Sequence, residues 1–329
     1  LRLYASMRPT APTRMRSRAV LLTDRVYPQG SSELPMPELP DLSVYVERLR
    51  ALTASRRLER VQLISPFLLR SVEPPMKRAE GVRVEHVERL GKRIVISLEG
   101  NLRLVLHLMI AGRLRWRAPG VKIPKPNLMA TFTFETGTLL FTEASKKKRA
   151  SLYLVAGDDG MAEHQRGGLE VLECDAATFK QALVAENHTL KRALTDPRIL
   201  SGIGNAYSDE ILWDAELSPF KQTQSLPAED LERLYQSTVT VLTRFTSAIR
   251  DETGDGFPEK VTAFRPDMAV HGKYKESCPR CAAPVQRIVY AANEANYCVR
   301  CQTGGKLLAD RALSRLLKAN WPKTLEELE

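Results

Sequence analysis

Four cysteines near the end of the chain constrain its fold more than any other feature. Cys278 and Cys281 form one Cys-x-x-Cys pair, Cys298 and Cys301 form a second, and sixteen residues separate the two pairs. Four thiolates complete a tetrahedral zinc shell and leave no open position for a substrate. The spacing therefore predicts one structural Zn²⁺ ion, held by a β-hairpin within residues 266–303.

The remaining cysteine and the charge balance indicate the environment and the partner. Cys174 stands alone and is expected in the core, so a disulfide framework is not expected. A reducing, cytoplasmic compartment follows. The formal net charge of +10 favours a polyanionic partner, with nucleic acid first. No apolar run approaches the length of a membrane span, and no membrane partner is expected.

The order of strand-like and helical segments predicts an α+β fold. Short alternating runs between residues 58 and 144, separated by Gly-Asn and Thr-Gly turns, are typical of an antiparallel β-sandwich. A helical 3.6-residue rhythm appears at 39–54 and returns from residue 175 onward. The expected divisions are a β-sandwich domain at 37–155, a linker at 156–172, a helical domain at 173–265, the cysteine hairpin at 266–303 and a helical tail at 304–329.

The beginning of the chain differs from the rest. Its first thirty-five residues hold six arginines against two acidic residues, with Pro, Ser and Thr scattered among them. The stretch lacks the ordered apolar region and small-residue cleavage site of a secretory signal. We expect residues 1–36 to be a non-native or processed basic extension that ends in an initiator Met36; a disordered basic tail is the alternative.

Three separated segments together resemble the formamidopyrimidine-DNA glycosylase and endonuclease VIII family. They are PELPD at 37–41, LSGIGNAYSDEIL at 200–212 and the four-cysteine hairpin, in that order. The resemblance runs from Pro37 to about Gln302. It implies a catalytic sandwich, a helix–two-turn–helix domain and a zinc finger. It also implies a monomeric, nucleoid-associated base-excision-repair enzyme that removes damaged bases from DNA and cleaves the abasic strand.

By this resemblance Pro37 is the nucleophile, an N-terminal proline exposed when Met36 is removed. A secondary amine attacks C1′ of the damaged nucleotide and forms an iminium, an electron sink that permits β- and δ-elimination. An amide nitrogen forms no iminium, so the expected start at Met36 matters for the chemistry. Glu38 matches a carboxylate that assists proton transfer and opening of the sugar ring. Lys92 matches the lysine that contacts the phosphate beside the lesion and supports elimination.

The same resemblance implies contacts with DNA phosphates. The segment around Gly204 contains G-x-G without a third glycine, so it is no dinucleotide fingerprint and instead resembles the turn of the helix–two-turn–helix motif. Lys191 and Asn205 are then implied as phosphate ligands. Glu210 matches an acidic position, with a structural helix-end role as an equal alternative. His107 matches a strand–loop position, with a packed or backbone-bonded histidine as its alternative.

The residues that fill the hole left by a flipped base depart from the formamidopyrimidine branch. Where that branch uses a Met, this chain has Ile110 preceded by Met109. Where it uses an Arg and a Phe from a second loop, this chain has Lys147 and Lys148, and no aromatic wedge remains there. A wedge from residues 108–110 alone is closer to endonuclease VIII, which favours oxidised pyrimidines. Preference for 8-oxoguanine is therefore not carried over.

The cysteine hairpin departs as well, and other function classes stay open. Asn293 stands where the family commonly has an Arg that grips the phosphates around the lesion, and Arg287 is the candidate replacement. One alternative is a non-catalytic or lyase-only protein of the same fold that binds damaged or abasic DNA. Another is a zinc-ribbon protein that binds RNA or protein, with the PELP match arising by chance.

Overall fold

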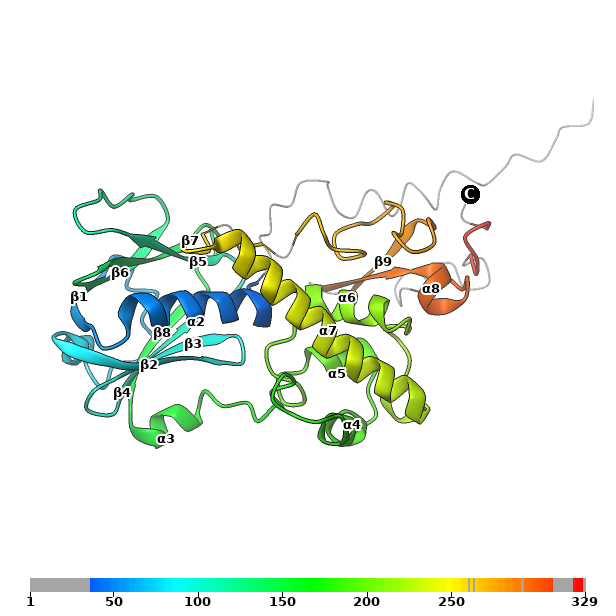
Figure 1. Ribbon diagram of the computed structural model, residues 1–329, viewed down its shortest axis with the longest axis horizontal. Helices are drawn as coiled ribbons and strands as arrows, with labels where there is room; N and C mark the ends of the chain where they lie inside the picture. Colours follow the sequence, from blue (N-terminus) through cyan, green and yellow to red (C-terminus); the bar gives the residue numbers. More distant parts are fainter. Residues whose placement is uncertain (1–35, 260, 263, 291–292, 310–321, 328–329) are drawn as a thin grey trace, which may run out of the picture.

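The chain forms two lobes with a cysteine hairpin beside the second lobe (Figure 1). The computed structural model describes residues 36–259, 261–262, 264–290, 293–309 and 322–327. The basic extension at 1–35 and most of the predicted helical tail lie outside these residues. In the described part, no helix combines the length and the apolar character that crossing a bilayer requires.

The first lobe is an antiparallel β-sandwich, which confirms the predicted fold class. Its strands follow the sheet order β5-β7-β6-β1-β2-β3-β4-β8. Only two residue pairs join β1 to β2, and Figure 1 shows the sheet folded there into two layers. The strands are β1 (Arg57–Leu63), β2 (Val82–Leu90), β3 (Arg93–Leu98), β4 (Leu102–His107), β5 (Gly112–Arg117), β6 (Leu128–Phe134), β7 (Gly137–Glu143) and β8 (Ser151–Ala156).

Helix α2 (Leu39–Thr53) lies between the two layers (Figure 1). Its apolar side chains repeat at helical spacing, and Leu42, Tyr45 and Leu49 are fully buried in the sandwich core. The helix begins at a buried polar turn, where the Asp41 carboxylate accepts the backbone amide of Glu38 at 3.0 Å. The apolar stripe therefore fixes how α2 sits in the sandwich, and Asp41 fixes where the helix starts.

The second lobe is helical. It contains α4 (Ala176–Val184), α5 (Leu190–Thr195), α6 (Asn205–Asp214) and the long α7 (Ala228–Thr253). Helix α6 is enclosed, and residues 206–212 are all buried. Tyr207 packs edge-on against Phe245 of α7, with ring centroids 5.2 Å apart. A short helix that was not predicted, α3 (Gly157–Ala162), lies within the expected linker.

The cysteine hairpin pairs β9 (Val285–Tyr290) with β10 (Asn293–Cys298), and α8 (Val299–Thr303) follows. The last described segment returns to this hairpin: Thr324 forms a β-bridge with Lys306, and the Leu307 amide donates to the Lys323 carbonyl at 2.8 Å. Leu325 packs against the apolar residues around the hairpin. The end of the described chain therefore braces the cysteine hairpin.

Burial of Asp41 predicts a pH-dependent stability. Burial raises the pKa of Asp41 to about 7 in the folded chain, against an ordinary value of 3.8. The folded state holds this proton between about pH 4 and pH 7 while the unfolded state has lost it. This residue therefore lowers stability as pH rises through that window, by at most about 1.4 kcal/mol per pH unit.

Asp41→Asn removes the titration, and its side-chain oxygen still accepts the Glu38 amide. We expect the variant to gain stability relative to the parent as pH rises from 5 to 8, measured as the free energy of unfolding in urea. Asp159→Asn, at an exposed position, is the control and should follow the parent. Parallel pH curves for Asp41→Asn and the parent would contradict the expectation.

Candidate active site

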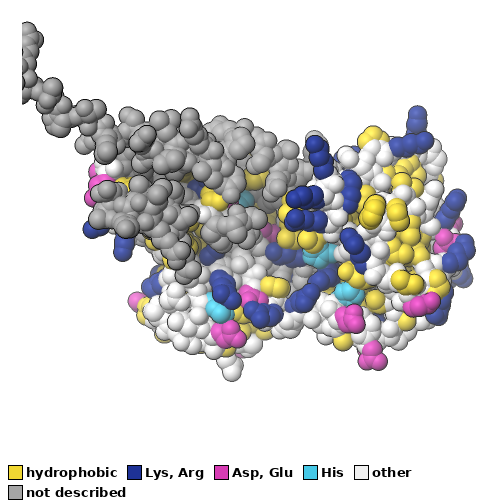
Figure 2. All heavy atoms as spheres, turned by 180° about the vertical axis from the view of Figure 1, so that it is seen from behind, with side chains coloured by type: hydrophobic (Ala, Val, Ile, Leu, Met, Phe, Trp, Pro, Cys, Tyr) yellow, Lys and Arg dark blue, Asp and Glu magenta, His cyan; other side chains and the backbone are white. Residues whose placement is uncertain are grey.

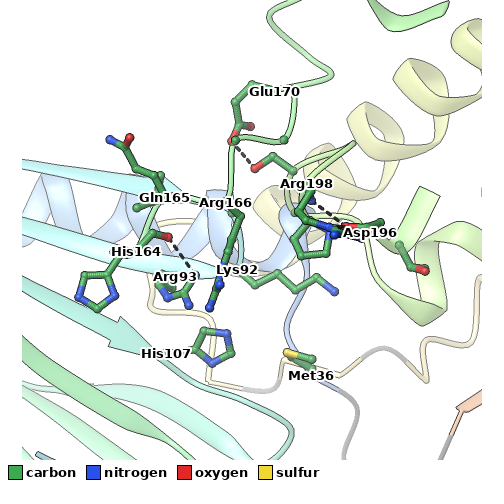
Figure 3. A pocket seen from close by; sticks show the side chains of 18 of the residues that line it. Met36, Lys92, Arg93, His107, His164, Gln165, Arg166, Glu170, Asp196 and Arg198 are labelled. Atoms are coloured by element: carbon green, nitrogen blue, oxygen red, sulfur yellow. Dashed lines mark hydrogen bonds and ion pairs between the residues drawn. The ribbon is translucent and has the colours of Figure 1, made fainter. Parts of the chain in front are cut away.

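A cavity of about 900 Å³ opens between the two lobes. Figure 2 shows Lys and Arg side chains gathered along the groove that leads to it. The sandwich contributes the β2–β3 turn and the end of β4, and the helical lobe contributes the end of α5 and the turn before α6. Residues 164–170, between α3 and α4, close one side. The labelled side chains in Figure 3 come from both lobes and from the connection between them.

The Glu38 carboxylate is bound at the N-terminus of α6. It accepts the backbone amides of Gly204 at 2.6 Å, Ala206 at 2.9 Å and Tyr207 at 3.3 Å. These amides have no partner within their own helix, and the helix dipole favours negative charge at this end. A second bond between the lobes, from the Leu39 amide to the Gly202 carbonyl at 3.0 Å, fixes the entry into α2. The lobes therefore meet at Glu38.

The Lys92 amine faces the same point from the sandwich. Gly91 and Lys92 form the tight turn of the β2–β3 hairpin, and Gly91 has φ +59°, a value that favours glycine. A Cβ built on Gly204 would overlap both Lys92 Nζ and the carboxyl group of Glu38. Only glycine at 204 leaves room for the two groups.

Burial lowers the pKa of Lys92. The Glu38 carboxylate raises this pKa, and the nearby Lys191 ammonium lowers it further. The amine consequently loses its proton more readily than an exposed lysine does.

Pro37 lies at the same junction. It is buried and directly follows Met36, which lines the cavity. Figure 3 shows Met36 beside the Lys92 side chain. The structure thus brings together the three residues that the sequence marked as catalytic: Pro37, Glu38 and Lys92.

His107 lies on the cavity wall as a neutral acceptor. The Met109 amide donates to His107 Nδ1 at 3.2 Å, so the ring proton is placed on Nε2. Burial, followed by the positive charges of Arg93 and Lys92, lowers the pKa of His107 to about 4. His107 therefore has the backbone hydrogen bond that was foreseen as the alternative, and it is also exposed to the cavity.

Of the residues predicted to enter the DNA helix, only Met109 lines the cavity. It sits in the β4–β5 turn with φ +52°, and Ile110 beside it is half-buried. Lys147 is exposed on the β7–β8 loop, whereas Lys148 is half-buried and donates to the Glu143 carbonyl at 2.5 Å. Neither lysine is among the cavity-lining residues.

Lys191 is placed inside the helical lobe, although it was predicted as a phosphate ligand. It is 2% exposed, and its Nζ lies 2.5 Å from Asp209 and 2.6 Å from the Asn205 carbonyl. A phosphate contact would require the ammonium to leave Asp209. Asn205 itself is half-buried as the first residue of α6.

Asp209 and Glu210, side by side on α6, attach the cysteine hairpin to the helical lobe. Asp209 Oδ2 lies 2.8 Å from His271 Nδ1 and accepts the Asn296 amide at 3.1 Å. Burial alone raises the pKa of Asp209, but Lys191 and His271 outweigh it and leave this pKa below its ordinary value.

Glu210 binds backbone rather than side chains. It accepts the amides of residues 269–271 at 2.8–2.9 Å, which is a structural role and matches the alternative foreseen for this residue. Asp209 and its partners had no sequence signal, because those partners lie 18 to 87 residues away along the chain.

The four cysteines of the hairpin can hold a metal ion. Their sulfur atoms all lie within 4.8 Å of one another. Tetrahedral Zn–S bonds of about 2.3 Å place sulfurs about 3.8 Å apart, so the set fits a zinc-sized ion after a small contraction. Trp213 of α6 donates its indole N–H to Cys278 Sγ at 3.3 Å, a contact that supports the site from the helical lobe.

The predicted replacement for the missing hairpin Arg is already engaged. Arg287 lies over the Tyr274 ring, 4.5 Å from its centroid, and 3.8 Å from Glu294. The Asn293 side chain lies outside the described parts of the structure. Arg287 would have to give up the Glu294 contact to grip a phosphate.

Known proteins match this chain in sequence over both lobes. Residues 36–149 match the formamidopyrimidine-DNA glycosylase N-terminal domain, and residues 169–255 match the formamidopyrimidine-DNA glycosylase H2TH domain. The formamidopyrimidine-DNA glycosylase of Thermus thermophilus is 34% identical over 281 residues, which span 82% of this chain and all of that protein.

Solved structures agree with the fold. The crystal structure of the MutM (Fpg) protein from Thermus thermophilus is similar with a TM-score of 0.68 and 32% identity, over 81% of this chain and 98% of that one. A complex between the Lactococcus lactis Fpg and abasic-site DNA is similar with a TM-score of 0.71 and 24% identity, over 81% and 99% of the two chains.

Proposed function

The chain belongs to the formamidopyrimidine-DNA glycosylase family, and from this premise we propose that Pro37, Glu38 and Lys92 carry its chemistry. As a member of that family it is a DNA glycosylase of base-excision repair with abasic-site lyase activity. The observation that supports the residue assignment is the convergence of the Lys92 amine and the Glu38 carboxylate at Gly204, with Pro37 directly before Glu38 in the chain. Of the other predicted site residues in the described structure, His107 and Met109 line the cavity.

Pro37 acts as the nucleophile once its nitrogen is free. The amine attacks C1′ of the damaged nucleotide, the bond from C1′ to the base breaks, and the sugar ring opens to an iminium. Loss of a proton from C2′ then expels the 3′ oxygen, and a second elimination expels the 5′ oxygen. Both eliminations use the iminium as the acceptor of the electron pair.

Glu38 and Lys92 assist this sequence from fixed positions. Glu38 moves a proton to the ring oxygen as the sugar opens, and the α6 amides keep the carboxylate oriented. Lys92 binds the phosphate beside the lesion. Bringing a phosphate next to the amine adds negative charge and favours its protonated form, which is the form that binds.

A free amine at Pro37 requires that the bond to Met36 be broken. The family match begins at residue 36, and the whole of the Thermus thermophilus relative aligns with this chain. We propose that the working enzyme begins at Pro37. While Met36 remains attached, its side chain lines the cavity that the damaged nucleotide has to enter.

Damaged DNA binds along the basic groove between the lobes (Figure 2). Met109 is best placed to occupy the space of the flipped base, with Ile110 beside it and with Lys147, Lys148 and Asn205 contacting the backbone. A wedge limited to the β4–β5 turn favours oxidised pyrimidines over 8-oxoguanine. The enzyme works as a monomer in the cytoplasm, associated with the nucleoid.

The hairpin binds zinc as a structural ion. Four thiolates with no free position suit folding rather than catalysis, because zinc supplies a rigid tetrahedral crosslink there. The ion joins both ends of the hairpin, and Trp213 and Asp209 hold that hairpin against α6.

Borohydride trapping tests the nucleophile. Protein freed of Met36, as confirmed by its mass, should form a covalent adduct with an abasic-site oligonucleotide, and peptide mapping should place the adduct on Pro37. Lys92→Met should keep the adduct on Pro37 and form it more slowly. Tight binding without any adduct would leave a damage-binding protein on the same fold, and an adduct on Lys92 would contradict the assignment to Pro37.

Gly204→Ala tests the convergence of Lys92 and Glu38. The added methyl group displaces Lys92 Nζ and the Glu38 carboxylate, and misplacement by about 1 Å costs on the order of 100-fold in rate. Single-turnover cleavage of abasic DNA measures the effect. Gly256→Ala, outside the cavity, is the matched control and should cleave as the parent does. Equal rates for both variants would count against a crowded centre at Gly204.

Zinc content tests the hairpin. Elemental analysis should find one zinc per chain, and Cys281→Ser should lose it together with part of the affinity for DNA. Cys174→Ser, which leaves the four-cysteine set intact, should keep the metal. The structural-zinc proposal fails if Cys281→Ser retains a full equivalent of zinc, or if the purified protein carries none and folds equally well.

A further inference from the structure

One wall of the cavity carries two arginines that face each other. Arg93 begins β3, and Arg166 belongs to the connection between α3 and α4. Figure 3 shows their guanidinium groups side by side, to the left of Lys92. The pKa of Arg93 is lowered first by burial and then by the Arg166 guanidinium, so the two charges act on each other. Like charges that lie close together repel each other unless an anion lies between them.

The acidic residues of the cavity are engaged elsewhere. Glu170 pairs with Arg89 and also accepts the Ser201 hydroxyl, and Asp196 pairs with Arg198 at 2.7 Å. Across the described ranges, no ion pair reaches Arg93 or Arg166. The positive charge on this wall is therefore uncompensated by the protein.

Arg93 also has unused hydrogen-bonding capacity. Among the residues that the structure describes, its Nε is buried without an acceptor, and its Nη1 reaches only the His164 carbonyl, at a long 3.4 Å. A buried donor without a partner destabilises the fold, and a bound acceptor would remove that cost. The pKa of His164, like that of His107, is lowered first by burial and then by Arg93. The positive charge of Arg93 thus lowers the pKa of both imidazoles on this wall.

We propose that Arg93 and Arg166 form a phosphate subsite, separate from Lys92, that binds one phosphate group of the damaged strand. The inference rests on the proposed function for the identity of the ligand as DNA. Two planar guanidinium groups match the oxygens of a phosphate in a bidentate manner, which a lysine does not. The group is either a phosphodiester of the uncut strand or the terminal phosphate left after elimination.

The salt dependence of binding tests this subsite. Each phosphate contact that is lost reduces the slope of log Kd against log salt by about 0.9. For duplex DNA with a stable abasic-site analogue, Arg93→Gln/Arg166→Gln should bind with a slope smaller by about this amount. Arg93→Lys keeps the charge and should restore most of the slope. Arg78→Gln, an exposed arginine outside the cavity, is the matched control and should show the parental slope.

Nicked duplexes distinguish the two sources of the phosphate. If the subsite binds a phosphodiester, the double variant loses slope on uncut DNA. If it binds a terminal phosphate, the parent prefers a nicked product with phosphate ends over one with hydroxyl ends, and the double variant loses that preference. Parental slope together with parental preference overturns the proposal. Arg166→Gln alone, in an exposed connection, keeps the test valid if Arg93→Gln folds poorly.

This test and that of the proposed function fail separately. Trapping at saturating abasic DNA reports the amine chemistry whatever the binding slope is. An adduct together with parental slope and parental preference overturns the subsite alone, and a changed slope or preference without any adduct overturns the catalytic assignment alone.

Discussion

The bond set between the Glu38 carboxylate and the first amides of α6 is the interaction on which the rest of the structure depends. It joins the start of α2 in the sandwich to the central helix of the other lobe. Because Glu38 directly follows Pro37, the same bonds place the proposed nucleophile. Because residue 204 is a glycine and has no side chain, the Lys92 amine has room to reach the same point. One charged group at a helix end thus sets the relative position of both lobes and of the chemistry between them.

Helix α6 extends this arrangement to the cysteine hairpin. Its N-terminus holds Glu38, and its own Asp209 and Glu210 hold His271, Asn296 and the backbone of residues 269–271. All these groups are buried, where an unpaired charge is costly, so each depends on its partners being in place. Helix α6 therefore contacts all three parts, the sandwich through Glu38 and the hairpin through Asp209 and Glu210.

Local patterns predicted those parts of the fold that local patterns determine. The cysteine spacing predicted the hairpin, and alternation predicted the sandwich that the structure confirms. Local patterns did not indicate the partner of Arg113 in β5, because the acceptor of its Nε, the Val261 carbonyl, lies 148 residues away along the chain. The burial of Lys191 was missed for the same reason, since a charged side chain reads as exposed unless its partner is known.

The candidate site, like the fold, could be predicted from the sequence only in part. The resemblance to the family, now confirmed, marked Pro37, Glu38 and Lys92 at positions that the structure brings together. It gave no signal for Arg93 and Arg166, which lie 73 positions apart and meet only in the folded chain.

Helix α7 fixes the width of the groove between the lobes. At 26 residues it is about 39 Å long, and it is fastened to the sandwich by the pair of Arg250 with Glu47 and to α6 by Phe245 against Tyr207. A continuous helix resists bending, so α7 keeps the two lobes at a fixed separation. In the proposed complex, a duplex that enters the groove has to adapt its own shape to this fixed separation. The deformation costs more free energy for stiff, undamaged DNA than for DNA weakened by a lesion. Helix α7 thereby makes the deformability of the DNA the first property that is selected, before any base is inspected.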